Sequence, residues 1–189
     1  MGFLSNDELE AIGFDRLGSN VLISDKISIY NPKNISIGSN VRIDDFCVIS
    51  VGHGGITIGN NVHIAVGASL IGAGKITLSN FVNISSRVAI YSSNDDYSGA
   101  TMTGPTLPTE FTNIRRADVF LGKHVIVGTG SVILPGLTLE DGVAVGALSL
   151  VTKNCMAFGI YAGIPAQRIK ERKQDLLILE EQYLATKTK

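Results

Sequence analysis

A six-residue spacing of aliphatic residues constrains this 189-residue chain more than any other feature. The spacing is unbroken through the six positions Leu121, Val127, Ile133, Leu139, Val145 and Val151. The next residue is often glycine, and the fifth position of each hexad is aliphatic or small. Such hexads are typical of a parallel β-helix, in which each forms one short strand with a turn and three form one triangular coil. Because one coil cannot bury its own aliphatic side chains, several coils must stack.

Earlier hexads keep this spacing but are interrupted. Their aliphatic positions are Ile37, Ile43, Ile49, Ile58, Ile64, Leu70, Leu78, Ile84 and Ile90. Three extra residues lie within the segment VGHGG and two within GAG, which predicts small protrusions there. The largest interruption runs from Tyr91 to Phe120, about 30 residues without a hexad. A loop of that length in a compact domain is usually functional or disordered.

The two ends of the chain differ from the middle. Ser5 and Glu8 have the spacing of a capping box, and Gly13 would end a short helix. Apolar residues recur at helical spacing among charged residues from about 167 to 185, which predicts an amphipathic helix packed on the coils or on a neighbouring subunit.

The chain therefore divides into three expected parts. These are a helical cap over 1–20, a β-helix over 21–165 with a loop at 91–120, and a helix over 166–189.

Composition excludes several classes of function. With 17 acidic and 16 basic residues, the chain lacks the charge of a dedicated nucleic-acid or anionic-membrane binder. No apolar run approaches the roughly 20 residues that span a bilayer, so we expect no membrane insertion. The two cysteines are too few for a disulfide framework, and MGFLSNDELE lacks the features of a signal peptide. We expect a cytoplasmic protein.

The hexads, the segment VGALSLVTKN and the ending YAGIPAQRI resemble the left-handed β-helix acyltransferases. This hexapeptide-repeat superfamily includes the galactoside and maltose acetyltransferases, and the resemblance covers about residues 21 to 170. It implies an all-β, left-handed coil, a homotrimer, and an acyl-CoA co-substrate, expected to be acetyl-CoA, in the groove between subunits. The implied CoA contacts are Thr129, Ala147, Thr152, Lys153 and Arg168. The alternative is that the small residues among them merely serve the coil turns.

One residue departs from the galactoside and maltose branch. When KITLSNFVNISSRVAIYSSNDD is aligned with that branch, Asp95 occupies the position of its general-base histidine. An alcohol that attacks a thioester must lose its proton, and histidine suits that task. An uncharged amine is already a nucleophile, so a carboxylate can serve by holding it in place. Asp95 therefore predicts N-acylation.

A second branch, the N-acyltransferases of nucleotide-linked amino sugars, is similar in NISSRVAIYSSNDDYSG, MTGPTLP and GKHVIVG. This resemblance implies that Ser85 and Asp95 reach the sugar amine, with Asp118 as a second carboxylate. The expected substrate contacts are Asn94, Asp96, Tyr97, Arg115, Arg116 and His63. Asp96 is the immediate rival of Asp95, and either carboxylate can instead cap a turn. The two arginines can meet a diphosphate or remain solvated.

The expected function is N-acylation of a nucleotide-linked amino-deoxysugar for a surface glycan of the O-antigen type. One rival is a sugar O-acetyltransferase whose base is His63, His53 or a water assisted by aspartate. Another is a non-catalytic β-helix scaffold. We expect no metal, because zinc sites on this kind of solenoid use closely spaced histidines that the chain lacks.

Overall fold

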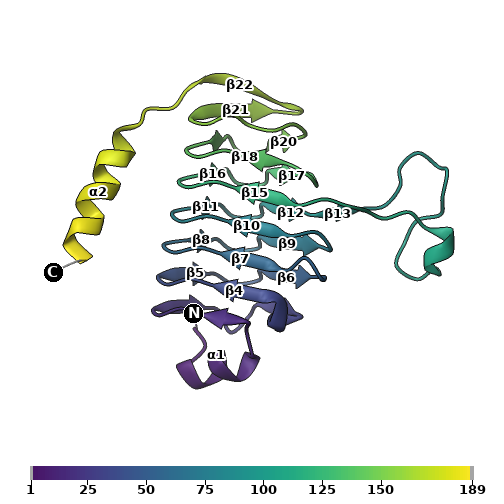
Figure 1. Ribbon diagram of the computed structural model, residues 1–189, viewed down its shortest axis with the longest axis horizontal. Coiled ribbons are helices and arrows are strands. Elements are labelled where there is room, and N and C mark those ends of the chain that lie inside the picture. Colours follow the sequence, from purple (N-terminus) through teal and green to yellow (C-terminus); the bar gives the residue numbers. More distant parts are fainter. Residues whose placement is uncertain (1, 188–189) are drawn as a thin grey trace.

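The computed structural model describes residues 2–187 and is a left-handed β-helix (Figure 1). Three sheets form its sides, and each is named here after its first strand. The β1 face contains β1 (Arg16–Leu17), β4 (Ile35–Ile37), β7 (Ile56–Ile58), β10 (Ile76–Leu78), β15 (Val119–Leu121) and β18 (Thr138–Leu139). The β2 face contains β2 (Val21–Ile23), β5 (Val41–Ile43), β8 (His63–Ile64), β11 (Asn83–Ile84), β16 (Ile126–Val127), β19 (Ala144–Val145), β21 (Gly159–Gly163) and β22 (Ala166–Glu171). The β3 face contains β3 (Ser28–Tyr30), β6 (Val48–Val51), β9 (Ser69–Gly72), β12 (Ala89–Tyr91), β17 (Val132–Ile133) and β20 (Leu150–Val151).

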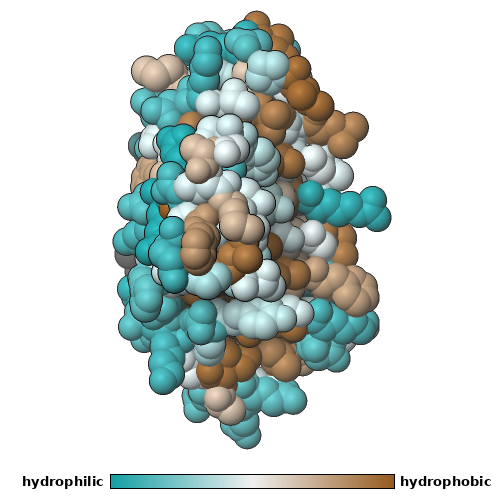
Figure 2. All heavy atoms as spheres, turned by 90° about the vertical axis from the view of Figure 1, so that its right-hand side faces the viewer, coloured by the Kyte–Doolittle hydropathy of each residue, from teal (hydrophilic) through white to brown (hydrophobic). Residues whose placement is uncertain are grey.

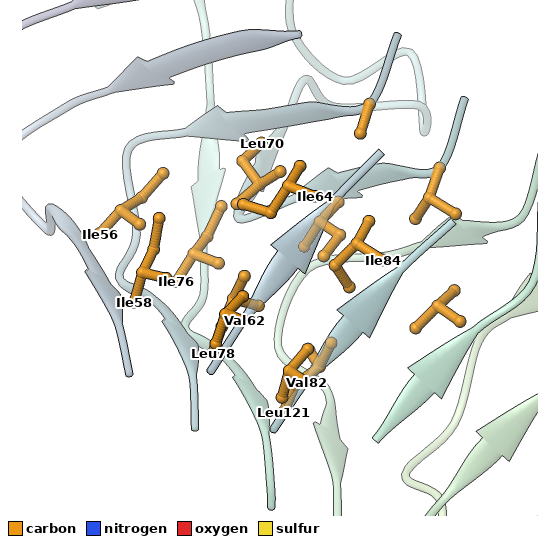
Figure 3. Close-up of a cluster of buried hydrophobic side chains, with 14 of the residues drawn as sticks. Ile56, Ile58, Val62, Ile64, Leu70, Ile76, Leu78, Val82, Ile84 and Leu121 are labelled. Atoms are coloured by element: carbon orange, nitrogen blue, oxygen red, sulfur yellow. The ribbon is translucent and has the colours of Figure 1, made fainter. Parts of the chain in front are cut away.

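The aliphatic ladders of the sequence form the core. All fifteen aliphatic positions of the expected hexads are at most 3% exposed. In the parallel register Ile43 faces Ile64, and Ile64 faces Ile84. Figure 3 shows Ile64 and Ile84 in neighbouring coils, with Val62 and Val82 forming a second row beside them. Burial of one such side chain contributes about 1.5–3 kcal/mol, so stability accumulates from coil to coil. The predicted all-β architecture is confirmed.

The edge between the β1 and β2 faces needs left-handed backbone. Asn20, Asn40, Asn61, Phe81 and His124 stand there in successive coils with φ between 54° and 62°. Asparagine tolerates this conformation, whereas phenylalanine and histidine adopt it rarely. The rings of Phe81 and His124 stack with centroids 4.8 Å apart, and this contact offsets part of the backbone cost.

A short helix covers the first coil. Helix α1 (Asn6–Ile12) has the expected capping box, because the Ser5 hydroxyl accepts from the Glu8 N–H and the Glu8 carboxylate accepts from the Ser5 N–H. Gly13 ends the helix with φ of 77°. The coil itself begins at Arg16 rather than at residue 21, because β1 already pairs with β4.

The C-terminal expectation was wrong in its first part. The segment Ala166–Glu171 is strand β22, antiparallel to β21, and helix α2 (Asp175–Lys187) begins only after it. The last coil leaves a row of backbone N–H and C=O groups unpaired, and β22 pairs with them. The hydrogen bonds gained in this pairing outweigh the preference for a helix that the spacing of Ile169 indicated, and Ile169 itself is exposed. Residues 188–189 of the expected helix lie outside the described residues.

Helix α2 packs against the coils, which is one of the two arrangements expected from the sequence. The Glu180 carboxylate lies 2.7 Å from both Lys123 Nζ and His124 Nε2, and the Tyr183 hydroxyl donates to Asn61 Oδ1 at 3.0 Å. Burial raises the pKa of Glu180, but the hydrogen bonds from Lys123 and His124 outweigh it, so the pKa is lowered. Neither described helix is both long and apolar enough to cross a bilayer.

The long loop projects from the edge between the β3 and β1 faces (Figure 1). Its two ends form an antiparallel ribbon of β13 (Ser93–Asn94) and β14 (Arg115–Arg116). A single 3₁₀ turn, η2 (Thr109–Phe111), lies within it, and a second one, η1 (Pro32–Asn34), lies at the same edge in the first coil. The loop is therefore an ordered hairpin whose root is anchored in the stack of coils.

The aliphatic ladder makes a first prediction. We expect Ile64→Ala to lower the free energy of unfolding by about 2–5 kcal/mol, because it leaves a cavity between two coils. Urea unfolding at fixed protein concentration measures this. The control Thr77→Ala changes an outward position of β10 and should cost less than about 1 kcal/mol. Equal costs at the two sites would contradict the inward ladder.

The contacts of Glu180 make a second prediction. Because its folded-state pKa lies below the ordinary 4.5, its contribution is complete above pH 4.5 and is lost as pH falls through the lowered value. Protection factors of the α2 amides, which are corrected for the intrinsic pH dependence of exchange, should therefore fall at low pH. In Glu180→Gln, which carries no titrating carboxylate there, these protection factors should be lower at neutral pH and should depend less on pH.

Candidate active site

The edge between the β2 and β3 faces carries a column of small residues. Ser85 follows β11 and donates its N–H to Val127 O at 3.0 Å, while Thr129 O accepts from Leu148 N at 2.8 Å in the coils above. Ser85 is half-buried, whereas Thr129 and Ala147 are exposed. Three expected site residues therefore line one edge, with Ser85 at the N-terminal end of the column.

Tight backbone contact explains part of this column. A Cβ on Gly128 would lie 2.5 Å from the backbone nitrogen of Ala147, closer than real atoms approach. The coil turns themselves therefore require small residues, which is the alternative that the sequence left open. The same absence of side chains exposes backbone groups that a slender ligand can reach.

The opposite edge of the β3 face carries the root of the loop. In the ribbon, Asn94 pairs with Arg115 and Ser93 with Arg116, and both arginine side chains are exposed. Within residues 2–187, Asn94 Oδ1 is the buried side-chain atom recorded without a hydrogen-bond partner. Thr152 and Lys153 follow β20 at this same edge, in a later coil. Thr152 is half-buried and Lys153 is exposed.

The loop encloses a hollow of about 470 Å³, lined in part by Asp95, Asp96 and Tyr97. Asp96 Oδ1 accepts from the Ser98 N–H at 2.8 Å, and Oδ2 accepts from the hydroxyls of Ser98 and Thr101 at 2.9 and 3.0 Å. These hydrogen bonds, led by that from the Ser98 backbone, lower the pKa of Asp96. Asp96 is thus the cap of this turn, and the spacing Asp-x-Ser was a sequence signal for it.

The Asp95 carboxylate is differently placed. It is half-buried at the hollow, and no other residue in 2–187 gives it a hydrogen bond or an ion pair. Of the two adjacent carboxylates, Asp95 is therefore the one available to a ligand. Asp118, on the far flank of the loop, is an exposed residue that uses one oxygen to accept from the Lys75 N–H at 2.8 Å.

The histidines lie away from this hollow. His63 points outward from β8, with Nε2 2.9 Å from Asp44 Oδ2, while Arg42 Nε lies 2.7 Å from Asp44 Oδ1. Burial raises the pKa of Asp44, but the hydrogen bonds from Arg42 and His63 outweigh it and lower the pKa. His53 lies in an exposed turn at the β3/β1 edge, whereas His124 is held by α2. No cluster of three or more potential metal ligands occurs among residues 2–187.

The remaining expected residue, Arg168, lies on β22 at the last coil. Its Nη2 is 2.6 Å from Glu171 Oε1, and its backbone pairs with Tyr161. Within one chain, most of the expected site residues therefore lie at one or the other edge of the β3 face. His63 lies on the β2 face, and Arg168 lies on β22, beyond the final coil.

Left-handed hexapeptide coils with a small-residue column and an acidic loop define the class of protein, the hexapeptide-repeat acyltransferases. No family model matches the chain. The chain is 55% identical, over 97% of its length and 95% of the relative's, to the dTDP-4-amino-4,6-dideoxy-D-glucose acyltransferase of Escherichia coli. The chain therefore belongs to the CoA-dependent N-acyltransferases of nucleotide-linked amino sugars.

Solved structures agree with this assignment. AntD, an N-acyltransferase from Bacillus cereus in complex with dTDP and 3-hydroxybutyryl-CoA, is 46% identical and superposes with a TM-score of 0.95 over 99% of this chain and 98% of its own. An AntD variant with a serine replaced by alanine, in complex with dTDP-4-amino-4,6-dideoxyglucose and coenzyme A, has a TM-score of 0.94 at 46% identity and covers 98% of each chain. A maltose O-acetyltransferase from Clostridium difficile 630, 22% identical with a TM-score of 0.59 over 90% of this chain and 80% of its own, shares the fold.

The different environments of the two loop carboxylates make a third prediction. We expect Asp96→Ala to accelerate proteolytic cleavage within the loop, because three hydrogen bonds that close its turn are lost. Asp95→Ala should leave the cleavage rate unchanged, since Asp95 closes no turn. Limited proteolysis followed by mass spectrometry separates the two, and equal acceleration in both variants would refute this division of roles.

Proposed function

We propose that the protein transfers an acyl group from acyl-CoA to the amine of a dTDP-linked 4-amino-4,6-dideoxy sugar, and that Asp95 holds this amine. The observation that carries the proposal is the unpaired Asp95 carboxylate at the loop hollow, in a chain 55% identical to an acyltransferase of that sugar. The AntD structures include variants in which one aspartate or one serine is replaced, the residue types that we assign to the site. The donor is expected to be acetyl-CoA, and the AntD complex with 3-hydroxybutyryl-CoA supports a four-carbon alternative.

The chemistry follows from charge. The sugar amine arrives largely as an ammonium ion, and Asp95 attracts and orients it. After one proton leaves to the carboxylate or to water, the nitrogen lone pair attacks the thioester carbonyl. The C–N bond forms, the C–S bond breaks, a second proton leaves the nitrogen, and the departing thiolate takes up a proton to become CoA thiol. The hydroxyl of Ser85 and the free oxygen of Asp118 are the further polar groups that we assign to the amine.

Two edges of one chain cannot surround one thioester, because Ser85 and Asp95 lie at opposite ends of the segment that contains β12. We infer that copies of the chain form a homotrimer in which the loop of one subunit meets the small-residue column of the next. Figure 2 shows hydrophobic side chains gathered along one side of the surface from which the loop projects. Exposed apolar residues on the β3 face and its edges are Tyr30, Phe46, Val66, Leu134, Leu148 and Ile164. Apolar patches of this kind favour subunit contact.

The same arrangement supports the assigned donor site. Thr129 and Ala147 would let the pantetheine arm approach the backbone, and Thr152 with Lys153 would come from the neighbouring subunit. Lys153 is an exposed cation suited to the phosphates of CoA. Arg168 would reach the nucleotide end by exchanging Glu171 for phosphate.

The biological setting is proposed from the substrates. An acylated nucleotide sugar is a precursor suited to a surface glycan of the O-antigen type. We place the enzyme in the cytoplasm, because acyl-CoA is a cytoplasmic co-substrate.

A paired-substrate assay makes the fourth prediction. With acetyl-CoA and two dTDP sugars that carry either an amine or a hydroxyl at C4, we expect release of CoA thiol with the amine only. Asp95→Asn should lower turnover by about 100-fold or more, the range for loss of a positioned proton acceptor. The control Glu181→Gln, on the exposed side of α2, should retain activity.

Two results would overturn the proposed function. Turnover of the hydroxyl sugar alone would indicate an O-acetyltransferase, whose base would then be sought at His63 or His53. Absence of measurable CoA binding by calorimetry would indicate a scaffold without catalysis.

A further inference from the structure

A second polar hollow, of about 380 Å³, lies on the β1 face close to its edge with the β3 face. Its lining includes Asp15, Lys33, Ser36, His53, Thr57 and Lys75. Lys33, His53 and Lys75 come from the three turns at this edge that precede the long loop. Two of these turns are the segments VGHGG and GAG, whose extra residues the repeat itself does not require.

The basic side chains of this hollow are uncompensated. The side chains of Lys33, His53 and Lys75 form no hydrogen bond or ion pair with any residue that the structure describes. The carboxylate of Asp15 is engaged by the hydroxyl of Ser36. Two lysine charges and an imidazole therefore face a polar cavity that holds a single carboxylate, which favours an anion.

The backbone brings these turns close together. A Cβ on Gly54 would lie 2.4 Å from the carbonyl carbon of Gly74, so consecutive turns are in direct contact. The Lys75 N–H donates to Asp118 Oδ1 at 2.8 Å, which joins the hollow to the end of the loop that carries Asp95. Arg115 and Arg116 are not part of this hollow. The guanidinium of Arg115 lies instead near Gly136, in the turn after the loop, where a Cβ built on that glycine would be 3.7 Å from Arg115 Nη2.

We propose that this hollow binds the diphosphate of the nucleotide-linked sugar through Lys33, His53 and Lys75. The inference rests on the proposed function and extends it to a part of the chain that the acyl transfer does not use. A sugar diphosphate diester carries two negative charges, which lysine ammonium groups match as point charges, while the hydroxyl of Thr57 can supply a neutral hydrogen bond. Because the hollow adjoins the loop root, a diphosphate held there leaves the sugar beside the loop.

Calorimetric binding of dTDP, thymidine and CoA tests the proposal as a fifth prediction. We expect Lys33→Met and Lys75→Met each to weaken dTDP binding by about tenfold, the usual loss for a hydrogen bond to a charged group. The affinities for thymidine, which lacks phosphate, and for CoA should stay unchanged. The control Lys173→Met removes an exposed lysine far along the chain and should change none of the three. Added salt should weaken dTDP binding less in a variant that carries both Lys33→Met and Lys75→Met than in the wild type.

The outcomes separate this site from the reaction. Unchanged dTDP affinity in both lysine variants, or a loss only in Arg115→Met and Arg116→Met, would overturn the hollow as the diphosphate site even if the wild type acylates the amino sugar. Loss of dTDP affinity in the lysine variants, in a wild type that transfers no acyl group, would keep the site and overturn the proposed function. Equal loss of thymidine and CoA affinity would indicate a general structural effect and would also refute the proposal.

Discussion

Stacking of aliphatic side chains between successive coils is the interaction on which the rest of this structure depends. Each hexad contributes so little buried surface that a single coil has no stability of its own, and Ile43, Ile64 and Ile84 become a core only as neighbours. Since the ladders lie inside the three-sided coil, the residues at its edges can vary in type and number. The site that we propose lies at those edges, where changes of sequence leave the ladders intact.

The edges show two ways of using this freedom. At one edge small residues such as Thr129 and Ala147 stay exposed beside larger side chains such as Leu148. At the other edge it inserts residues, a few in each of the early turns and about 30 between Tyr91 and Phe120. A ligand that needs both a narrow groove and charged contacts is served only when the two edges face each other. This requirement connects the solenoid to the inferred association of subunits.

In the proposed function, electrostatics distinguishes acylation of an amine from acylation of a hydroxyl. Histidine suits a substrate whose proton must be removed during attack, whereas an unpaired carboxylate suits a substrate that arrives as a cation. Asp96 contributes indirectly, because its hydrogen bonds to Ser98 and Thr101 close the turn beside Asp95. At the proposed diphosphate site the charges are reversed: Lys33 and Lys75 lack anionic partners within the described chain and therefore suit an anionic group of the substrate.

The sequence by itself determined the coil, the inward residues, the capping box of Ser5 and Glu8 and the position of the loop, because periodicity and capping are local properties of the chain. Its resemblance to the galactoside and maltose branch also predicted that Asp95 stands in the position of a general-base histidine. Only the tertiary structure showed that Asp96 caps the turn while Asp95 has no hydrogen-bond partner among residues 2–187, since this depends on which carboxylate finds donors within the folded loop. Tertiary structure likewise made Ala166–Glu171 a strand, because the unpaired edge of β21 is created by the whole stack of coils and is invisible in the segment itself.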